Sequence, residues 1–217
     1  MLRSRSLLFL LVVCCLLPTA HAADDALAPG IYADPDPAAV VWYPAPGNRG
    51  KYRELLNKEV QRHPRNVVAR VQRAYLLDRA GNHERAQRDY EAALDASEPD
   101  SLERRHILWS RGWSRYDMGD IAGALADWRE SVRLHGGHPS WVAYTFALAH
   151  WTQDDKPRAL AWYDAAVASK QEWSTEAGMA DNTRHWRPEQ RERIQALFEH
   201  WNTARAQPVD PAGRASG

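Results

Sequence analysis

The chain has 217 residues, and its 28 lysines and arginines balance 28 aspartates and glutamates, so the formal net charge is zero. Nucleic-acid-binding surfaces carry an excess of basic side chains, so this balance argues against nucleic acid as a partner. The length suits one domain. Ten tryptophans stand against three phenylalanines and three methionines, an unusual ratio that requires a structural or functional reason.

Residues 1–22 have the pattern of a secretory signal peptide. Arg3 and Arg5 precede an apolar run at 7–17, and the small-residue site Ala20-His21-Ala22 follows it. The run is shorter than the roughly 20 apolar residues that span a bilayer. We therefore expect cleavage after Ala22 and no stable membrane anchor afterwards.

Both cysteines of the chain, Cys14 and Cys15, lie inside this apolar run. Neither follows the small residue that lipoprotein acylation needs, so a lipoprotein is disfavoured and both cysteines leave with the signal. Cleavage also removes two of the 28 basic residues and no acid, which leaves 26 against 28. The mature chain can then form no disulfide and no thiolate metal site, and the periplasm is its expected location.

Prolines mark residues 23–49 as an extended segment. The runs Asp34-Pro35-Asp36-Pro37 and Tyr43-Pro44-Ala45-Pro46 are too rich in proline for a helix. The stretch 40–43 is the apolar part of the segment, and it could lie extended against the body of the protein. At the other end of the chain, the abundance of proline, glycine and alanine predicts a disordered tail at 206–217.

Between residues 50 and 205 the apolar residues recur at helical spacing, which predicts an all-α domain. Asp100 and Glu103 resemble a capping box at the start of one helix, and Pro188 is placed to open the last one. The stretch between 169 and 188 is expected to be irregular. The predicted helices span about 52–60, 67–80, 86–94, 100–118, 121–132, 140–153, 157–169 and 188–201.

One phrase of residues occurs three times in this region, at offsets of 38 and 35 residues. Its copies are Ala86-x3-Tyr90-x2-Ala93, Ala124-x3-Trp128-x2-Ser131 and Ala159-x3-Tyr163-x2-Ala166. Upstream of each copy lies a helix with a small residue at its centre, namely Ala74, Gly112 and Ala147. The two helices of each unit are separated by the turns Gly81-Asn82, Gly119-Asp120 and Asp154-Asp155.

This pattern resembles the tetratricopeptide repeat, which has a period of about 34 residues and small residues where its paired helices cross. The resemblance covers about half of the chain directly. It implies an α-solenoid of antiparallel helical hairpins, with about three repeats. Stacked hairpins need caps at both ends. The helix at 52–60, as half of a preceding repeat, and the helix at 188–201 are expected to serve as caps.

Two equivalent positions change together between the repeats. Arg73 and Asp89 in the first repeat correspond to Arg111 and Asp127 in the second. In the third repeat the same two positions hold the aromatic residues Phe146 and Trp162. If the two positions touch, both should change together, from two opposite charges to two aromatic rings. We therefore predict the ion pairs Arg73 to Asp89 and Arg111 to Asp127.

Many of the aromatic residues are expected to face the groove that the first helices of stacked hairpins line. Trp109, Trp113 and Tyr116 lie at i, i+4 and i+7 and therefore share one helical face. Trp and Tyr dominate interface hot spots, so this surface is the predicted binding site. Packing of the rings in the core, or cover by residues 40–46, are the alternatives. The predicted groove residues are Tyr75, His106, Trp109, Trp113, Tyr116, Trp141, Tyr144 and Trp151.

No motif for catalysis, a cofactor or a metal is present in the sequence. There is no glycine-rich phosphate loop, no nucleophile elbow and no cysteine-based metal motif. His135 and His138 flank two glycines without a third ligand nearby, which indicates an ordinary turn. His150, beside Trp151, is interpreted as a packed or groove histidine. Catalytic, cofactor and metal sites are therefore not expected.

The sequence thus favours a non-enzymatic periplasmic adaptor that binds a protein or peptide of the cell envelope in its aromatic groove. A carbohydrate-binding protein that uses the same Trp and Tyr surface is the alternative, because aromatic rings also stack on sugar faces. An enzyme whose residues assemble only in the folded chain is the third and least favoured hypothesis. The fold analogy gives a binding mode and no partner.

Overall fold

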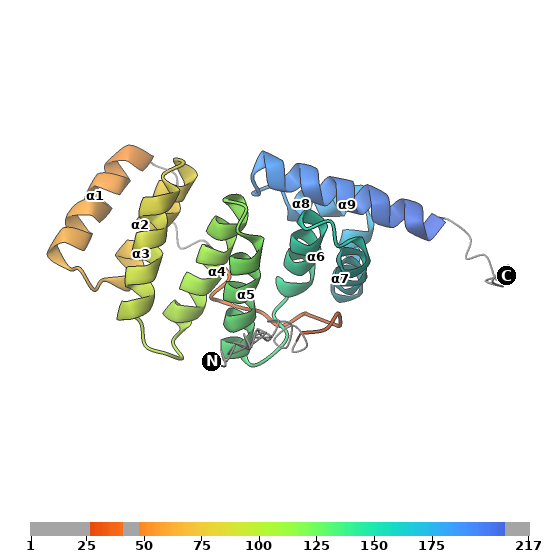
Figure 1. Cartoon of the computed structure of the whole chain (residues 1–217), viewed down its shortest axis with the longest axis horizontal. Coiled ribbons are helices and arrows are strands. Elements are labelled where there is room, and N and C mark those ends of the chain that lie inside the picture. Colours follow the sequence, from red (N-terminus) through yellow and green to blue (C-terminus); the bar gives the residue numbers. More distant parts are fainter. Residues whose placement is uncertain (1–26, 41–47, 207–217) are drawn as a thin grey trace, which may run out of the picture.

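A computed structural model describes residues 27–40 and 48–206 of the chain (Figure 1). Within these ranges the protein is all-α. The nine α-helices are α1 (Arg49–Arg62), α2 (Val67–Arg79), α3 (His83–Ala96), α4 (Leu102–Asp117), α5 (Ile121–His135), α6 (Val142–Thr152), α7 (Lys156–Ser169), α8 (Glu176–Asn182) and α9 (Pro188–Ala206), and a short 3₁₀ helix, η2, covers Gln171–Ser174.

The predicted helices are present, with two corrections. The N-cap of α4 is Ser101, whose hydroxyl accepts from the Arg104 N–H, and not the Asp100 and Glu103 pair. The stretch predicted to be irregular before Pro188 contains η2 and α8. The signal peptide, the stretch 41–47 and the tail beyond Ala206 lie outside the described residues, and Ala206 itself ends α9.

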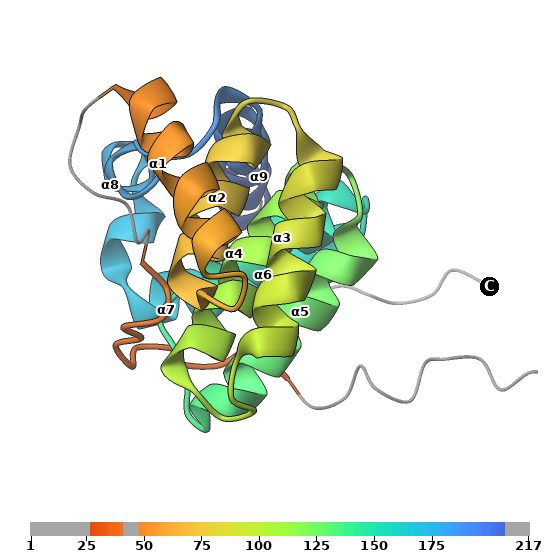
Figure 2. The same cartoon turned by 90° about the vertical axis from the view of Figure 1, so that its left-hand side faces the viewer.

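Six of the helices form antiparallel pairs in chain order, α2 with α3, α4 with α5, and α6 with α7, here called hairpins one, two and three (Figures 1 and 2). Each turn needs a residue in the left-handed region. Gly81 (φ 77°) and Gly119 (φ 85°) supply it in hairpins one and two, and Asp154 (φ 59°) supplies it in hairpin three. Aspartate tolerates this conformation, so hairpin three turns without a glycine.

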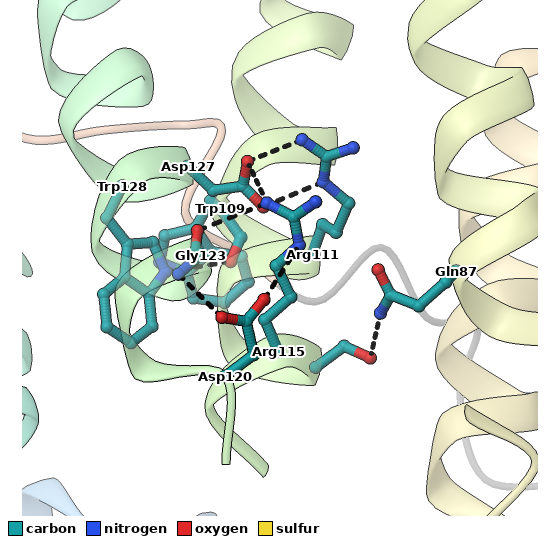
Figure 3. Close-up of polar contacts among 9 residues, drawn as sticks. Gln87, Trp109, Arg111, Arg115, Asp120, Gly123, Asp127 and Trp128 are labelled. Atoms are coloured by element: carbon teal, nitrogen blue, oxygen red, sulfur yellow. Dashed lines mark hydrogen bonds and ion pairs between the residues drawn. The ribbon is translucent and has the colours of Figure 1, made fainter. Parts of the chain in front are cut away.

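The small residue at the centre of α4 sets the distance between the helices of hairpin two. A Cβ on Gly112 would lie 2.2 Å from Nε1 of Trp128, a fully buried residue of α5. The same indole N–H donates to the Trp109 carbonyl at 3.2 Å (Figure 3). Trp128 therefore fills the space that the glycine leaves, as the repeated phrase predicts.

Both predicted ion pairs are present. The Arg73 guanidinium donates to Asp89 at 2.7 and 2.6 Å. The Arg111 guanidinium donates to Asp127 at 2.8 and 2.6 Å (Figure 3). The carboxylates are almost completely buried, with 5% and 4% of their side chains exposed. In hairpin three, the rings of Phe146 and Trp162 pack together instead, with centroids 5.0 Å apart.

In each of these ion pairs a second arginine, not predicted from the sequence, also contacts the aspartate. Arg70 lies 3.0 Å from Asp89, and Arg115 lies 3.1 Å from Asp127. Each pair of arginines lies on the first helix of its hairpin, at a spacing of three or four residues, and so reaches the same carboxylate from one helical face.

Helices at the two ends cover the stacked hairpins. At one end α1 packs against α2, with Leu56 and Val60 buried. At the other end α9 packs on α6 and α7 and buries Ile194, Leu197, Phe198 and Trp201. Both predicted caps are thus in place (Figure 1).

The N-terminal strap, residues 27–40, runs along hairpins two and three (Figure 1). The ring of Tyr32 packs against Trp162, with centroids 5.5 Å apart. The Asp36 carboxylate is fully buried and accepts from Arg105 at 2.8 Å and from the Trp141 indole at 3.0 Å. The strap is therefore bound to the body through both ring packing and polar contacts. Of the apolar stretch 40–43, Val40 alone is described, and it is exposed; the rest lies outside the described residues.

The buried ion pair of hairpin two should matter more for stability than an exposed one. Asp127→Asn keeps the size of the side chain but leaves the buried Arg111 without its counter-charge and removes one of the two that face Arg115, so the free energy of unfolding should fall by about 3 kcal/mol. Glu130→Gln is the control, because Glu130 pairs with Arg133 on the surface. Urea unfolding of both variants should show a large loss for Asp127→Asn and almost none for Glu130→Gln; equal losses would contradict the prediction.

Gly112→Ala should destabilise the protein even though alanine is the better helix former. The added methyl group overlaps Trp128, and overpacking of this kind costs about 1–3 kcal/mol. In a Trp128→Phe background, where the ring is smaller, the same substitution should cost less, and a double-mutant cycle of urea unfolding measures this coupling. A cost that does not depend on residue 128 would show that the contact does not limit helix approach.

Candidate functional site

A cavity of about 210 Å³ lies between the first helices of the hairpins and the link that joins α8 to α9. Tyr75 on α2, Trp109 and Trp113 on α4, Tyr144 on α6 and Trp186 in the link contribute aromatic side chains to its wall. The lining also includes Val71 of α2, Tyr90 of α3, and polar residues of α2, α4, the link and α9. We call this space the aromatic cavity.

Five of the eight predicted groove residues line the aromatic cavity, and these are Tyr75, His106, Trp109, Trp113 and Tyr144. Each lies on the first helix of its hairpin. The helical spacing therefore identified which side of α2, α4 and α6 these residues occupy.

The other three predicted groove residues are placed elsewhere. Tyr116 is buried between hairpins and its hydroxyl lies 2.7 Å from Thr152 Oγ1. Trp141 is 2% exposed because the strap covers it, and its indole donates to Asp36. Trp151 packs against His200 of α9, with ring centroids 5.4 Å apart. Neighbouring segments cover these three rings, which the spacing within a single helix could not reveal.

Trp186 and Arg187 belong to the cavity and were missed by the sequence analysis. They lie in the link before α9, where no helical periodicity assigns a face. The Trp186 ring packs against Trp113 and Tyr144, with centroids 5.2 and 5.7 Å apart. A tryptophan in an otherwise polar link was the only signal in the sequence.

One end of the cavity is polar and holds two carboxylates from different helices. Arg187 lies between them, with Nη2 2.5 Å from Asp78 Oδ2 and Nε 2.8 Å from Asp117 Oδ2. Gln190 donates to Asp117 at 2.5 Å, and the Ser114 hydroxyl donates to Asp78 at 2.8 Å. Arg187 therefore ties the ends of α2 and α4 to the start of α9.

Burial controls the protonation of two groups on the cavity wall. It raises the pKa of Asp117 to about 6, because the loss of hydration outweighs the attraction of Arg187. It lowers the pKa of His106 to about 4, although the Ala38 carbonyl and Asp36 act in the opposite direction. His106 is therefore neutral at pH 7, with Nδ1 2.8 Å from the Ala38 carbonyl oxygen.

The size of the cavity and its wall favour the binding of a small group. A cavity of roughly 150 Å³ accepts a benzene molecule, so about 210 Å³ holds one or two groups of that size.

Over residues 27–40 and 48–206, no cluster of three or more His, Cys, Asp or Glu side chains is arranged to hold a metal ion. Of the helices described, none is long and apolar enough to cross a membrane.

Comparison with known proteins assigns no family to the chain. No protein-family model matches it, and no curated protein is significantly similar to it. The stacked helix pairs and the cavity geometry therefore carry the functional argument.

The raised pKa of Asp117 predicts a pH-dependent stability. Its folded pKa of about 6 exceeds the ordinary 3.8, so this carboxyl favours the folded state most below pH 4 and loses that contribution as the pH rises through 6. Asp117→Asn removes the titration. Relative to this variant, the wild type should lose roughly 2–3 kcal/mol of unfolding free energy between pH 4 and pH 7.5.

Urea unfolding of both proteins at the two pH values measures this change. Titrations shared by the two proteins cancel in the difference, so only the groups coupled to Asp117 contribute. A difference that stays constant with pH would contradict the raised pKa.

Proposed function

We propose that the chain is an exported scaffold of the tetratricopeptide-repeat type that binds a segment of a protein or peptide partner in the aromatic cavity. The repeated phrase, the antiparallel hairpins and the glycine that admits Trp128 support the repeat assignment. The signal-like residues 1–22 support a periplasmic location. No catalytic role, cofactor or metal is part of the proposal.

One observation carries the proposal: aromatic side chains from four separate elements surround a single opening. Tyr75, Trp109, Trp113, Tyr144 and Trp186 come from α2, α4, α6 and the link before α9. Trp and Tyr provide large, rigid contact area and dominate binding hot spots. A space of about 210 Å³ accepts one or two side chains and no folded domain, so the partner inserts an exposed segment.

A carbohydrate is the second candidate ligand, because the same rings could stack on the face of one sugar. The polar groups at the end of the cavity disfavour it, since Asp78 and Asp117 already accept hydrogen bonds from Arg187, Gln190 and Ser114. The carboxylate oxygens that would accept hydrogen bonds from sugar hydroxyls are thus already used in hydrogen bonds within the protein, although the negative charge of the two groups is not removed by the neutral donors Gln190 and Ser114.

Filling the cavity should weaken binding strongly without removing any packed side chain. Ser110 lines the cavity and is half-buried, so Ser110→Phe places a ring inside it. Ala126→Phe, at an exposed position of α5 outside the cavity, is the matched control. Peptides selected on the wild-type protein from a displayed library should bind Ser110→Phe at least about tenfold more weakly and bind the control as they bind the wild type.

Tryptophan fluorescence titrations with selected peptides and with envelope glycan fragments separate the two ligands. Peptide binding that Ser110→Phe weakens supports the proposal. Glycan binding without peptide binding would replace it with the carbohydrate alternative, and peptide binding that Ser110→Phe leaves unchanged would remove the cavity from the function.

A further inference from the structure

The polar end of the aromatic cavity carries an unbalanced charge. Arg187 supplies one positive charge to two carboxylates, those of Asp78 and Asp117, whose side chains are only 7% and 10% exposed. Gln190 and Ser114 add neutral hydrogen bonds to them. With both acids ionised, this group retains one negative charge, and an uncompensated buried charge is costly.

The other basic groups near the cavity do not balance this charge from inside. Arg79 lies at the cavity wall, but it is exposed and its charge is screened by water. His83 contacts Asp78 at 2.8 Å from a side chain that is 35% exposed. His106 is neutral at pH 7, and His185 is exposed and contacts Arg184.

The aromatic walls also suit a cation. Trp186 is inclined by 59° to Trp113 and by 46° to Tyr144, so its ring is not stacked face to face on either of them, and all three rings line the cavity. The face of an aromatic ring is electronegative and attracts ammonium and guanidinium groups, most strongly where water is excluded.

The link before α9 shows that the two carboxylates accept a basic side chain at this end of the cavity. Trp186 packs on the rings of Trp113 and Tyr144, and the next residue, Arg187, places its guanidinium between the two carboxylates. The protein thus already holds an aromatic side chain and a basic side chain, adjacent in sequence, at this site.

We propose that the segment bound in the aromatic cavity presents a lysine or arginine side chain, which lies beside Arg187 against the carboxylates and the aromatic faces. This inference rests on the proposed function and specifies its ligand. Charge complementarity carries it: one guanidinium serves two buried acids, and a second cation completes the balance.

Matched probes on the wild-type protein test the charge requirement directly. Blocked Ala-Lys-Ala should bind about tenfold more tightly than blocked Ala-norleucine-Ala, which has a similar shape and no charge. Choline and its neutral isostere 3,3-dimethylbutan-1-ol form a second pair and represent a free small cation. Tryptophan fluorescence and calorimetry give the affinities.

Two substitutions test the source of the preference. Asp117→Asn should reduce the lysine peptide's affinity about fivefold or more and change the norleucine peptide's affinity much less, so that the ratio of the two affinities falls. Arg79→Gln, at an exposed position, should raise the affinity for lysine about twofold. Circular dichroism checks folding, and should Asp117→Asn not fold, Arg79→Gln and the wild-type probe pairs still decide.

Each outcome distinguishes this inference from the proposed function. Equal binding of the lysine and norleucine peptides, weakened by Ser110→Phe, would overturn the inference and leave peptide binding intact. Choline binding without any peptide binding would overturn both in favour of a small free cation. Lysine-selective binding that Asp117→Asn weakens would support the inference.

Discussion

A single helical hairpin cannot bury both of its faces, and this constraint organises the molecule. Each hairpin depends on its neighbour, and the terminal ones depend on α1, on α9 and on the strap (Figure 1). Helix α9, which covers one end of the stacked helix pairs, also forms part of the cavity wall. Trp186 and Arg187 lie in the cavity wall just before α9, the helix that covers hairpin three, and Arg187 contacts α2 and α4 there.

The exchange of an ion pair for an aromatic pair in hairpin three has a clear structural role. Phe146 and Trp162 replace the arginine and aspartate of the other hairpins, and Trp162 then offers a ring against which Tyr32 of the strap packs. A buried arginine and aspartate in their place would offer no apolar surface there. The substitution therefore goes together with the attachment of the strap to this hairpin.

Local patterns in the sequence predicted the helices, the hairpin pairing and the two ion pairs, because each depends on spacing within about 40 residues. The site was predicted only in part. Helical spacing assigned Trp141 and Trp151 to the groove face in the same way as Trp109. In the structure, however, residues distant in sequence cover them: Asp36 contacts Trp141, and His200 packs against Trp151. Arg187 was missed because its partners, Asp78 and Asp117, lie on other helices and no periodic pattern connects them.

The strap joins the beginning of the described chain to residues that are synthesised much later. Tyr32 donates its N–H to Ser169, 137 residues away, and Asp36 accepts from Trp141, 105 residues away. Contacts of such separation form only after most of the chain is available. A polypeptide that emerges from the ribosome amino end first can therefore attach the whole strap only after α7 has been synthesised, so the fold is completed late in synthesis.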